Sequence, residues 1–314
     1  MSAKDVTYLG ASFALPPRND TIASVFTKHQ LRPNAKPKLD HVTMEGKTAI
    51  ITGGNTGIGL ECGRIMLAQG ISHLILASRS VARGEEAAAP LVKANSKATI
   101  EVWQLDMASY DSIKAFAQKC ADLRRLDSVV LGAGIMNLDF QRSPETNHEE
   151  MFQINYLSQA LLALLLLPTL RDKNPSSGSP GHLTLVASGA ALVATFVERN
   201  QPQLIQSLDR SEHWTSASAK QRYDDSKGMI LMLTHKLSLL ANHENTIVNV
   251  VDPTFTPGTG FFHKVPLLMR VVLWPLVTLL GTSVNNAAWR YFDGAAVRGA
   301  ETHGSFVSDW EISP

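Results

Sequence analysis

Two side chains in this sequence, Tyr223 and Lys227, have the types and the spacing that proton transfer requires. They stand four residues apart at the start of a helix-like run, and side chains at this spacing on a helix point the same way. An ammonium beside a phenol stabilises the phenolate, so we expect the pKa of Tyr223 to fall from about 10 toward the range of a general acid or base. Because such pairs also occur by chance, the elements around them must decide whether this one reacts.

A glycine-rich turn stands between the apolar segment 48–52, typical of a strand, and the helix-like segment 60–69. Backbone N–H groups at the start of a helix attract phosphate, and glycines let a pyrophosphate approach closely. A tight turn without a ligand is the alternative. We expect a dinucleotide to contact Gly53, Asn55, Thr56, Gly57, Ile58 and Gly59.

The rest of the chain alternates between apolar, strand-like segments and helix-like segments. The expected strands are 48–52, 73–77, 100–105, 128–131, 182–187 and 246–251, and the expected helices are 60–69, 82–94, 112–121, 149–167 and 223–240. This alternation predicts an α/β fold with a doubly wound parallel sheet and helices on both faces. We expect residues 1–43, rich in Pro, Lys and Asn, to form an N-terminal extension and residues 44–314 to form a single domain.

The motif that begins at Thr52 reads T-G-x-x-x-G-x-G. In this motif the sequence resembles the short-chain dehydrogenase/reductase family, and the resemblance extends over roughly residues 20–314. It implies a three-layer Rossmann fold, a nicotinamide cofactor and oxidoreductase activity. The segment from Glu301 to Asp309, with its H-G-x-F-x-S-D pattern, further resembles fungal members, many of which act in secondary-metabolite biosynthesis.

The resemblance places four reacting residues, each in a motif of its own. Tyr223 would be the general acid or base, and Lys227 would lower its pKa and bind the nicotinamide ribose. Ser188, at the end of a strand, would stabilise the substrate oxygen, and Asn155, within a long helix, would hold a water that feeds protons toward Lys227. Seen alone, Ser188 could equally be a turn residue and Asn155 an interior polar residue bonded to backbone.

The residue after the second expected strand bears on which nicotinamide cofactor is bound. An acidic residue there would bind the ribose hydroxyls, whereas Arg79 favours a 2′-phosphate, so we expect NADP(H). The alternative for Arg79 is a solvated loop charge. Asp106, with Met107 beside it, matches the family position that contacts the adenine, although an Asp after a strand is often a helix cap.

Two positions depart from the family pattern. Gly132 replaces the Asn of the N-A-G motif, and Thr254 stands where the P-G motif has glycine, which puts the backbone path past the nicotinamide in doubt. Further cofactor contacts are expected at Ala133, Gly134, Phe255 and Thr256.

Large apolar side chains surround the presumed nicotinamide end in sequence. Pockets lined in this way bind bulky apolar molecules, so we expect a hydrophobic ketone or aldehyde, or the matching alcohol. We expect residues 255–282 to form a lid, with contact to a membrane surface as the alternative. The candidate lining residues, each of which could instead belong to the core, are Met136, Leu138, Phe196, Trp214, Phe255, Phe261, Phe262, Leu267, Leu268 and Trp274.

Composition excludes several other functions. A net charge of +1 gives no electrostatic footprint for nucleic acid, and the ten histidines form no zinc-binding pattern. The two cysteines cannot form a disulfide framework, which together with the absence of a signal peptide predicts a cytoplasmic protein. The apolar runs 160–167 and 265–280 are too short or too interrupted to span a membrane.

The family resemblance implies a homo-oligomer, either a dimer or a tetramer. A non-redox cyclase or isomerase with the same pocket and a nucleotide-sensing protein remain the alternatives.

Overall fold

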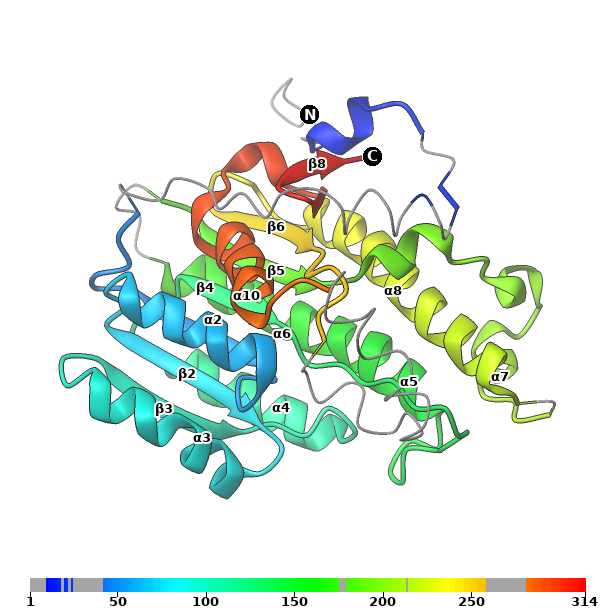
Figure 1. Ribbon diagram of the computed structural model, residues 1–314, viewed down its shortest axis with the longest axis horizontal. Coiled ribbons are helices and arrows are strands. Elements are labelled where there is room, and N and C mark those ends of the chain that lie inside the picture. Colours follow the sequence, from blue (N-terminus) through cyan, green and yellow to red (C-terminus); the bar gives the residue numbers. More distant parts are fainter. Residues whose placement is uncertain are drawn as a thin grey trace.

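The computed structural model describes residues 10–17, 20, 21, 24, 42–174, 179–212, 214–257 and 281–314. Its centre is an eight-stranded sheet with the strand order β3-β2-β1-β4-β5-β6-β7-β8, in which every pair is parallel except β7 and β8 (Figure 1). The order reverses beside β1, so the carboxyl ends of β1 and β4 flank the crevice in which α/β proteins bind ligands. The strands are β1 Thr48–Thr52, β2 His73–Ser78, β3 Thr99–Gln104, β4 Ser128–Leu131, β5 Gly181–Val186, β6 Thr246–Val251, β7 Phe306–Ser308 and β8 Glu311–Ser313.

Helices cover both faces of this sheet and form two apolar cores. On one face lie α2 Gly57–Ala68, α3 Val81–Ala94 and α10 Val284–Phe292. On the other lie α4 Tyr110–Ala121, α6 Ser158–Lys173 and α8 Ser216–Ser238. Strands β1, β4 and β6 are buried along their whole length, which explains why they read as continuous apolar runs without alternation. The predicted doubly wound fold is confirmed.

Two of the expected helices differ most from the structure in their extent. Helix α8 begins at Ser216, seven residues before Tyr223, because Thr215 and Ser218 form a capping box that the apolar pattern did not reveal. The helix expected over 149–167 consists of α5 Glu150–Phe152, a π-helical turn over Gln153–Leu157 and α6, which continues through Pro168 to Lys173. Residue 164, whose carbonyl loses its helical partner at Pro168, is exposed, so water can satisfy that carbonyl.

Helix Glu150–Lys173 is long and apolar enough to cross a membrane by composition, although 61% of its most apolar stretch is buried. Its residues Leu162, Leu166 and Leu170 are fully buried in the core beneath the sheet. We therefore interpret it as a core helix.

The N-terminal and lid predictions fall partly on residues that the structure leaves undescribed. Within the extension, the 3₁₀ turn Ala11–Ala14 lies near the chain's C-terminus, with the Ser12 hydroxyl 3.1 Å from the Ser305 hydroxyl and Phe13 against His235. Residues 258–280, the greater part of the expected lid, lie outside the described residues.

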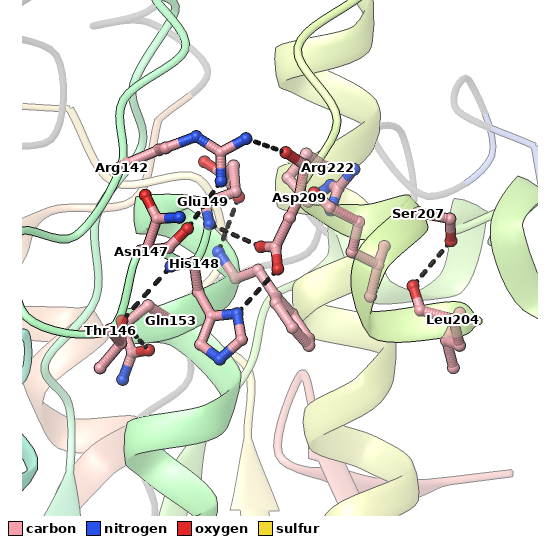
Figure 2. Close-up of polar contacts among 12 residues, drawn as sticks. Arg142, Thr146, Asn147, His148, Glu149, Gln153, Leu204, Ser207, Asp209 and Arg222 are labelled. Carbon is pink, nitrogen blue, oxygen red and sulfur yellow. Dashed lines mark hydrogen bonds and ion pairs between the residues drawn. The ribbon is translucent and has the colours of Figure 1, made fainter.

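The insert between β5 and α8 is held to the loop that precedes α5 by contacts of Asp209 (Figure 2). It contains 3₁₀ turns at Gly189–Val193 and Val197–Asn200 and the short helix α7 Leu204–Leu208. The Asp209 carboxylate accepts a hydrogen bond of 2.8 Å from the Glu149 backbone N–H and lies 2.8 Å from His148 Nδ1. Arg142 donates to the Asp209 carbonyl at 2.7 Å, and the buried Arg222 of α8 donates to the Leu208 carbonyl. These bonds hold the insert beside the start of α5.

Candidate active site

A cavity of about 850 Å³ opens at the carboxyl ends of the central strands. Of the seventeen residues predicted for the site, sixteen line it, and only Asn155 does not. The cavity therefore joins the expected phosphate turn at one end to Tyr223 and Lys227 at the other.

The glycine turn has the geometry of a phosphate cradle. Gly53 and Gly57 have φ angles of +69° and +53°, a region that side chains other than glycine rarely occupy. At Gly59 a Cβ would come within 2.5 Å of the Gly53 carbonyl oxygen, so no side chain fits there. Helix α2 begins at Gly57, three residues earlier than expected, and the side chain of Thr56 at its N-cap makes no capping hydrogen bond. The first N–H groups of α2 and the positive end of its dipole are thus available to an anion in the cavity.

Arg79 and Asp106 mark the far end of the cavity. Arg79 is exposed directly after β2 and forms no ion pair within the described part of the chain, so its guanidinium is available to a phosphate. Asp106 also lines the cavity, but its Oδ1 accepts a hydrogen bond of 2.9 Å from the Ala108 N–H. Asp106 therefore stabilises its own turn, and this role is compatible with a ligand contact.

Three of the side chains predicted to react come together from two elements, the end of β5 and helix α8. Ser188 follows β5 and hydrogen-bonds the Tyr223 phenol, which projects from α8. One turn further along α8, Lys227 Nζ donates to the Val186 carbonyl at 3.0 Å and lies 5.8 Å from the centroid of the Tyr223 ring. A substrate oxygen that lay between Ser188 and Tyr223 would face two hydroxyl donors.

The prediction that the pKa of Tyr223 is lowered was wrong for the protein without a bound ligand. Burial raises the pKa of this phenol above its usual value, the Ser188 hydrogen bond opposes the rise, and the negative charges of Asp252 and Asp224 add to it. Burial also lowers the pKa of Lys227 to about 8, against the attraction of Asp252. The sequence pattern reported the shared helix face correctly but carried no information on the cost of removing both groups from water.

Asn155 lies behind the cavity wall. Its side chain exchanges two hydrogen bonds with the backbone of Ile135, 2.8 Å from the N–H and 2.9 Å to the carbonyl, and donates to the Ser226 hydroxyl at 3.2 Å. A Cβ on Gly134 would lie 3.3 Å from Asn155 Oδ1 and 3.5 Å from Lys227 Nζ, so both side chains flank this glycine. Asn155 thus connects the end of β4 to the helix beneath it, at a π-helical turn of the kind found at functional sites.

Thr254 has a left-handed backbone conformation, which glycine adopts more readily than other residues. Its φ is +61°, a strained value for a β-branched residue, and two contacts hold it there. The buried Asp252 carboxylate accepts from the Thr254 N–H at 2.8 Å, and the Thr254 hydroxyl donates to that of Thr282 at 2.6 Å. Because the second Asp252 oxygen accepts from Ser308 at 3.2 Å, this one carboxylate fixes the loop to β7.

We expect Asp252→Ala to lower the free energy of unfolding by about 2–3 kcal/mol, since it removes the acceptor of the buried Thr254 N–H and a hydrogen bond to Ser308, beside a strained residue. Urea unfolding of Asp252→Ala and Asp252→Asn measures this, because Asn keeps one acceptor oxygen for the Thr254 N–H and should lose less stability. An Ala variant as stable as the unmodified protein would show that the carboxylate does not hold the loop.

The substrate end of the cavity is more polar than expected. Met136 and Phe255 line it as predicted. Leu138, Phe196 and Trp214 do not, so this part of the prediction was wrong: Trp214 donates to the Leu138 carbonyl at 2.9 Å, and Phe196 packs in the cluster around Phe152. The predicted lining residues Phe261, Phe262, Leu267, Leu268 and Trp274 lie outside the described residues.

Four polar lining residues were missed at this end. Asn137 donates to the Glu150 carboxylate, and Lys220 forms an ion pair of 2.5 Å with Asp224. Lys220 and Asp224 stand four apart on either side of Tyr223, a spacing that could have placed them near the site. Across the described ranges, no group of His, Cys, Asp and Glu is arranged to hold a metal ion.

Comparison with known proteins gives a consistent picture. Residues 47–199 match the family model described as short chain dehydrogenase. The short chain dehydrogenase/reductase mfmJ of Annulohypoxylon moriforme is 41% identical over 92% of this chain and 83% of its own length. The short chain dehydrogenase virL of Hypocrea virens is 38% identical over 89% of this chain and 81% of its own length.

Solved structures share the fold at low identity. A gluconate 5-dehydrogenase from Burkholderia cenocepacia, in complex with NADP and tartrate, superposes with a TM-score of 0.61 at 17% identity, covering 86% of this chain and 96% of that protein. A short-chain dehydrogenase from Sphingobium yanoikuyae, in complex with NADPH, gives 0.56 at 19% identity, covering 77% and 81%.

Proposed function

Because this chain belongs to the short-chain dehydrogenase/reductase family, we propose that it is an NADP(H)-dependent oxidoreductase that reduces a ketone or aldehyde to an alcohol, or catalyses the reverse. The observation that carries the proposal is a single cavity with a phosphate cradle and Arg79 at one end and Ser188, Tyr223 and Lys227 at the other. A dinucleotide that spans this cavity would bring its nicotinamide to the two hydroxyls.

Within this proposal the protein supplies geometry and a proton, and the reduced nicotinamide, when bound, supplies the hydride. Ser188 hydrogen-bonds the carbonyl oxygen of the substrate and stabilises the charge that develops there. Tyr223 gives its proton to the same oxygen, and burial keeps the phenol protonated until it does so. Lys227 binds the ribose hydroxyls next to the nicotinamide, and Asn155, behind Gly134, completes a route that resupplies protons.

Arg79 supports NADP(H) as the cofactor because its exposed guanidinium, unpaired among the described residues, suits a 2′-phosphate. We expect Arg79→Ala to weaken NADPH binding about 10- to 100-fold, the effect of losing a charge-assisted hydrogen bond, and to leave NADH binding unchanged. Fluorescence titration with both cofactors measures the ratio. Arg64→Ala, which removes an exposed arginine paired to Glu61 on α2, is the matched control. Equal loss for NADPH and NADH would contradict a 2′-phosphate contact.

We propose a bulky, mainly apolar substrate of the secondary-metabolite kind that also carries polar groups. Met136 and Phe255 support the apolar part, and Glu150 and Lys220 support the polar part. The related short chain dehydrogenases come from fungi, which favours this class. The test is NADPH consumption with a panel of bulky ketones and aldehydes, with and without hydroxyl or carboxyl groups. No oxidation of NADPH by any member, despite NADPH binding, would remove the redox proposal.

One observation favours a second candidate, a cyclase or isomerase that uses the same pocket without redox chemistry. Gly132 and Thr254, which line the cavity, stand where the family motifs have Asn and Gly, so the end of the cavity expected to hold the nicotinamide departs from the redox pattern. Conversion of a substrate at an unchanged NADPH concentration would support this candidate over the first.

The cellular location and the oligomeric state of the enzyme are also proposals. Two buried free cysteines, Cys62 and Cys120, suit the cytoplasm. Leu164 of α6 and Met232 of α8 are each about half exposed, which supports a dimer or tetramer. Membrane contact through 255–282 rests on sequence, since most of that segment lies outside the described residues.

A further inference from the structure

Tyr291, near the end of α10, is a second buried phenol in the wall of the same cavity. Helix α10 packs beside α2, the helix that follows the glycine turn (Figure 1). Tyr291 is 4% exposed, belongs to the apolar core around α2 and also lines the cavity. A residue so far along the chain, on the other side of the segment 258–280, would not be assigned to the cofactor site by sequence.

The Tyr291 ring occupies the space into which a side chain at residue 132 would extend. A Cβ at Gly132 would lie 3.3 Å from Tyr291 Cε2 and 3.1 Å from the Thr52 carbonyl oxygen, closer than ordinary van der Waals contact. A side chain the size of asparagine at this position would have to displace the ring. Gly132 and Tyr291 are therefore sterically coupled, so that the end of β4 can be lined by its own side chain or by the phenol of α10, but not by both.

The Tyr291 hydroxyl is poised for a ligand. Within the described part of the chain it makes no hydrogen bond, although its side chain is more than nine-tenths buried and faces the cavity. Burial raises the pKa of Tyr291, and the negative charge of Asp252 acts in the same direction, so the hydroxyl stays neutral and can donate.

We propose that Tyr291 is a cofactor-positioning residue whose hydroxyl donates a hydrogen bond to the middle of the dinucleotide, where the pyrophosphate joins the nicotinamide ribose. Its place supports this assignment, because its ring lies against Gly132 at the end of β4 and Tyr223 and Asp252 are within electrostatic range of its hydroxyl. The inference rests on the proposed binding of NADP(H). It explains how the chain lacks an asparagine at residue 132 without leaving the site open: a side chain from α10 lines that part of the wall.

The first test measures cofactor binding directly. We expect Tyr291→Phe to weaken NADPH binding about 5- to 20-fold by calorimetry, as for the loss of one hydrogen bond, while the melting temperature without NADPH stays the same. Tyr110→Phe, at the start of α4 and away from the cavity lining, is the matched control and should bind normally. Normal NADPH binding by Tyr291→Phe would overturn the inference. Failure of the unmodified protein to bind NADPH would instead overturn the proposed function on which it rests.

The second test measures the steric coupling without a cofactor. We expect Gly132→Asn alone to lower the melting temperature, and Gly132→Asn with Tyr291→Ala to be more stable than the two separate losses predict. Strict additivity of the two changes in a double-mutant cycle would show that the ring does not exclude a side chain at residue 132. If the single Gly132→Asn variant does not fold, a double variant that folds supports the steric coupling, and a double variant that also fails to fold contradicts it.

Discussion

Tyr223→Phe should lower kcat/KM for carbonyl reduction about 10²- to 10⁴-fold, the usual contribution of a positioned general acid. The change removes one oxygen and leaves the ring, so Lys227 keeps its hydrogen bond to the Val186 carbonyl and the cavity keeps its shape. NADPH affinity should therefore stay within about twofold, and the loss should lie in kcat. Stopped-flow measurement of NADPH oxidation with an accepted ketone separates binding from reduction.

Tyr156→Phe is the control for this experiment. Tyr156 is, like Tyr223 and Tyr291, a tyrosine whose pKa is raised by burial, but it stacks on Phe152 and does not line the cavity. It should retain activity. If Tyr223→Phe reduces the ketone as fast as the unmodified protein, the proton comes from another group and the proposed mechanism is wrong.

The fold and most of the residues that line the cavity could be predicted from the sequence because both depend on local patterns. Fully buried strands read as apolar runs, and the glycines of the turn are required by positive φ angles and close backbone contacts. The carboxyl ends of parallel strands meet at one edge, so motifs that follow β1, β2 and β4 had to come together. Asn155 departs from this pattern, because its side chain bonds to the backbone of Ile135 behind the wall.

What the sequence did not reveal depends on contacts between distant residues. Tyr291 faces Gly132 across 159 positions, and no spacing rule connects the two. Trp214 was expected in the pocket, but its indole N–H is used by the Leu138 carbonyl and its ring packs against Phe140. The pKa of Tyr223 was misjudged for the same reason, since burial is a property of the assembled fold and here it outweighs a lysine one helical turn away.

Burial makes Lys227 costly for stability, so Lys227→Met should separate activity from stability. Reduction should fall about 100-fold or more, because the variant loses the charge and the donor that would hold the ribose. The free energy of unfolding at pH 7 should be unchanged or higher, since a buried cation is replaced by an apolar side chain of similar length. Activity and urea unfolding, measured on the same preparation, test both expectations. Loss of stability equal to that of Asp252→Ala would show that Lys227 mainly supports the fold.

The pH dependence of stability gives the sharper form of this prediction. The unfolded chain keeps the Lys227 proton up to the ordinary pKa of 10.5, whereas the folded protein releases it at about 8. Between these values the folded state binds fewer protons, so the contribution of Lys227 to the free energy of unfolding rises with pH, by about 3 kcal/mol in total at about 1.4 kcal/mol per pH unit. Lys227→Met should lack this rise, and Lys236→Met, which removes an exposed lysine of the same helix, should keep it. Over the same interval the reduction rate of the unmodified enzyme should fall, because Lys227 loses its positive charge when it releases this proton. An activity that stays constant from pH 7 to 10 would mean that the charge of Lys227 takes no part in the reaction.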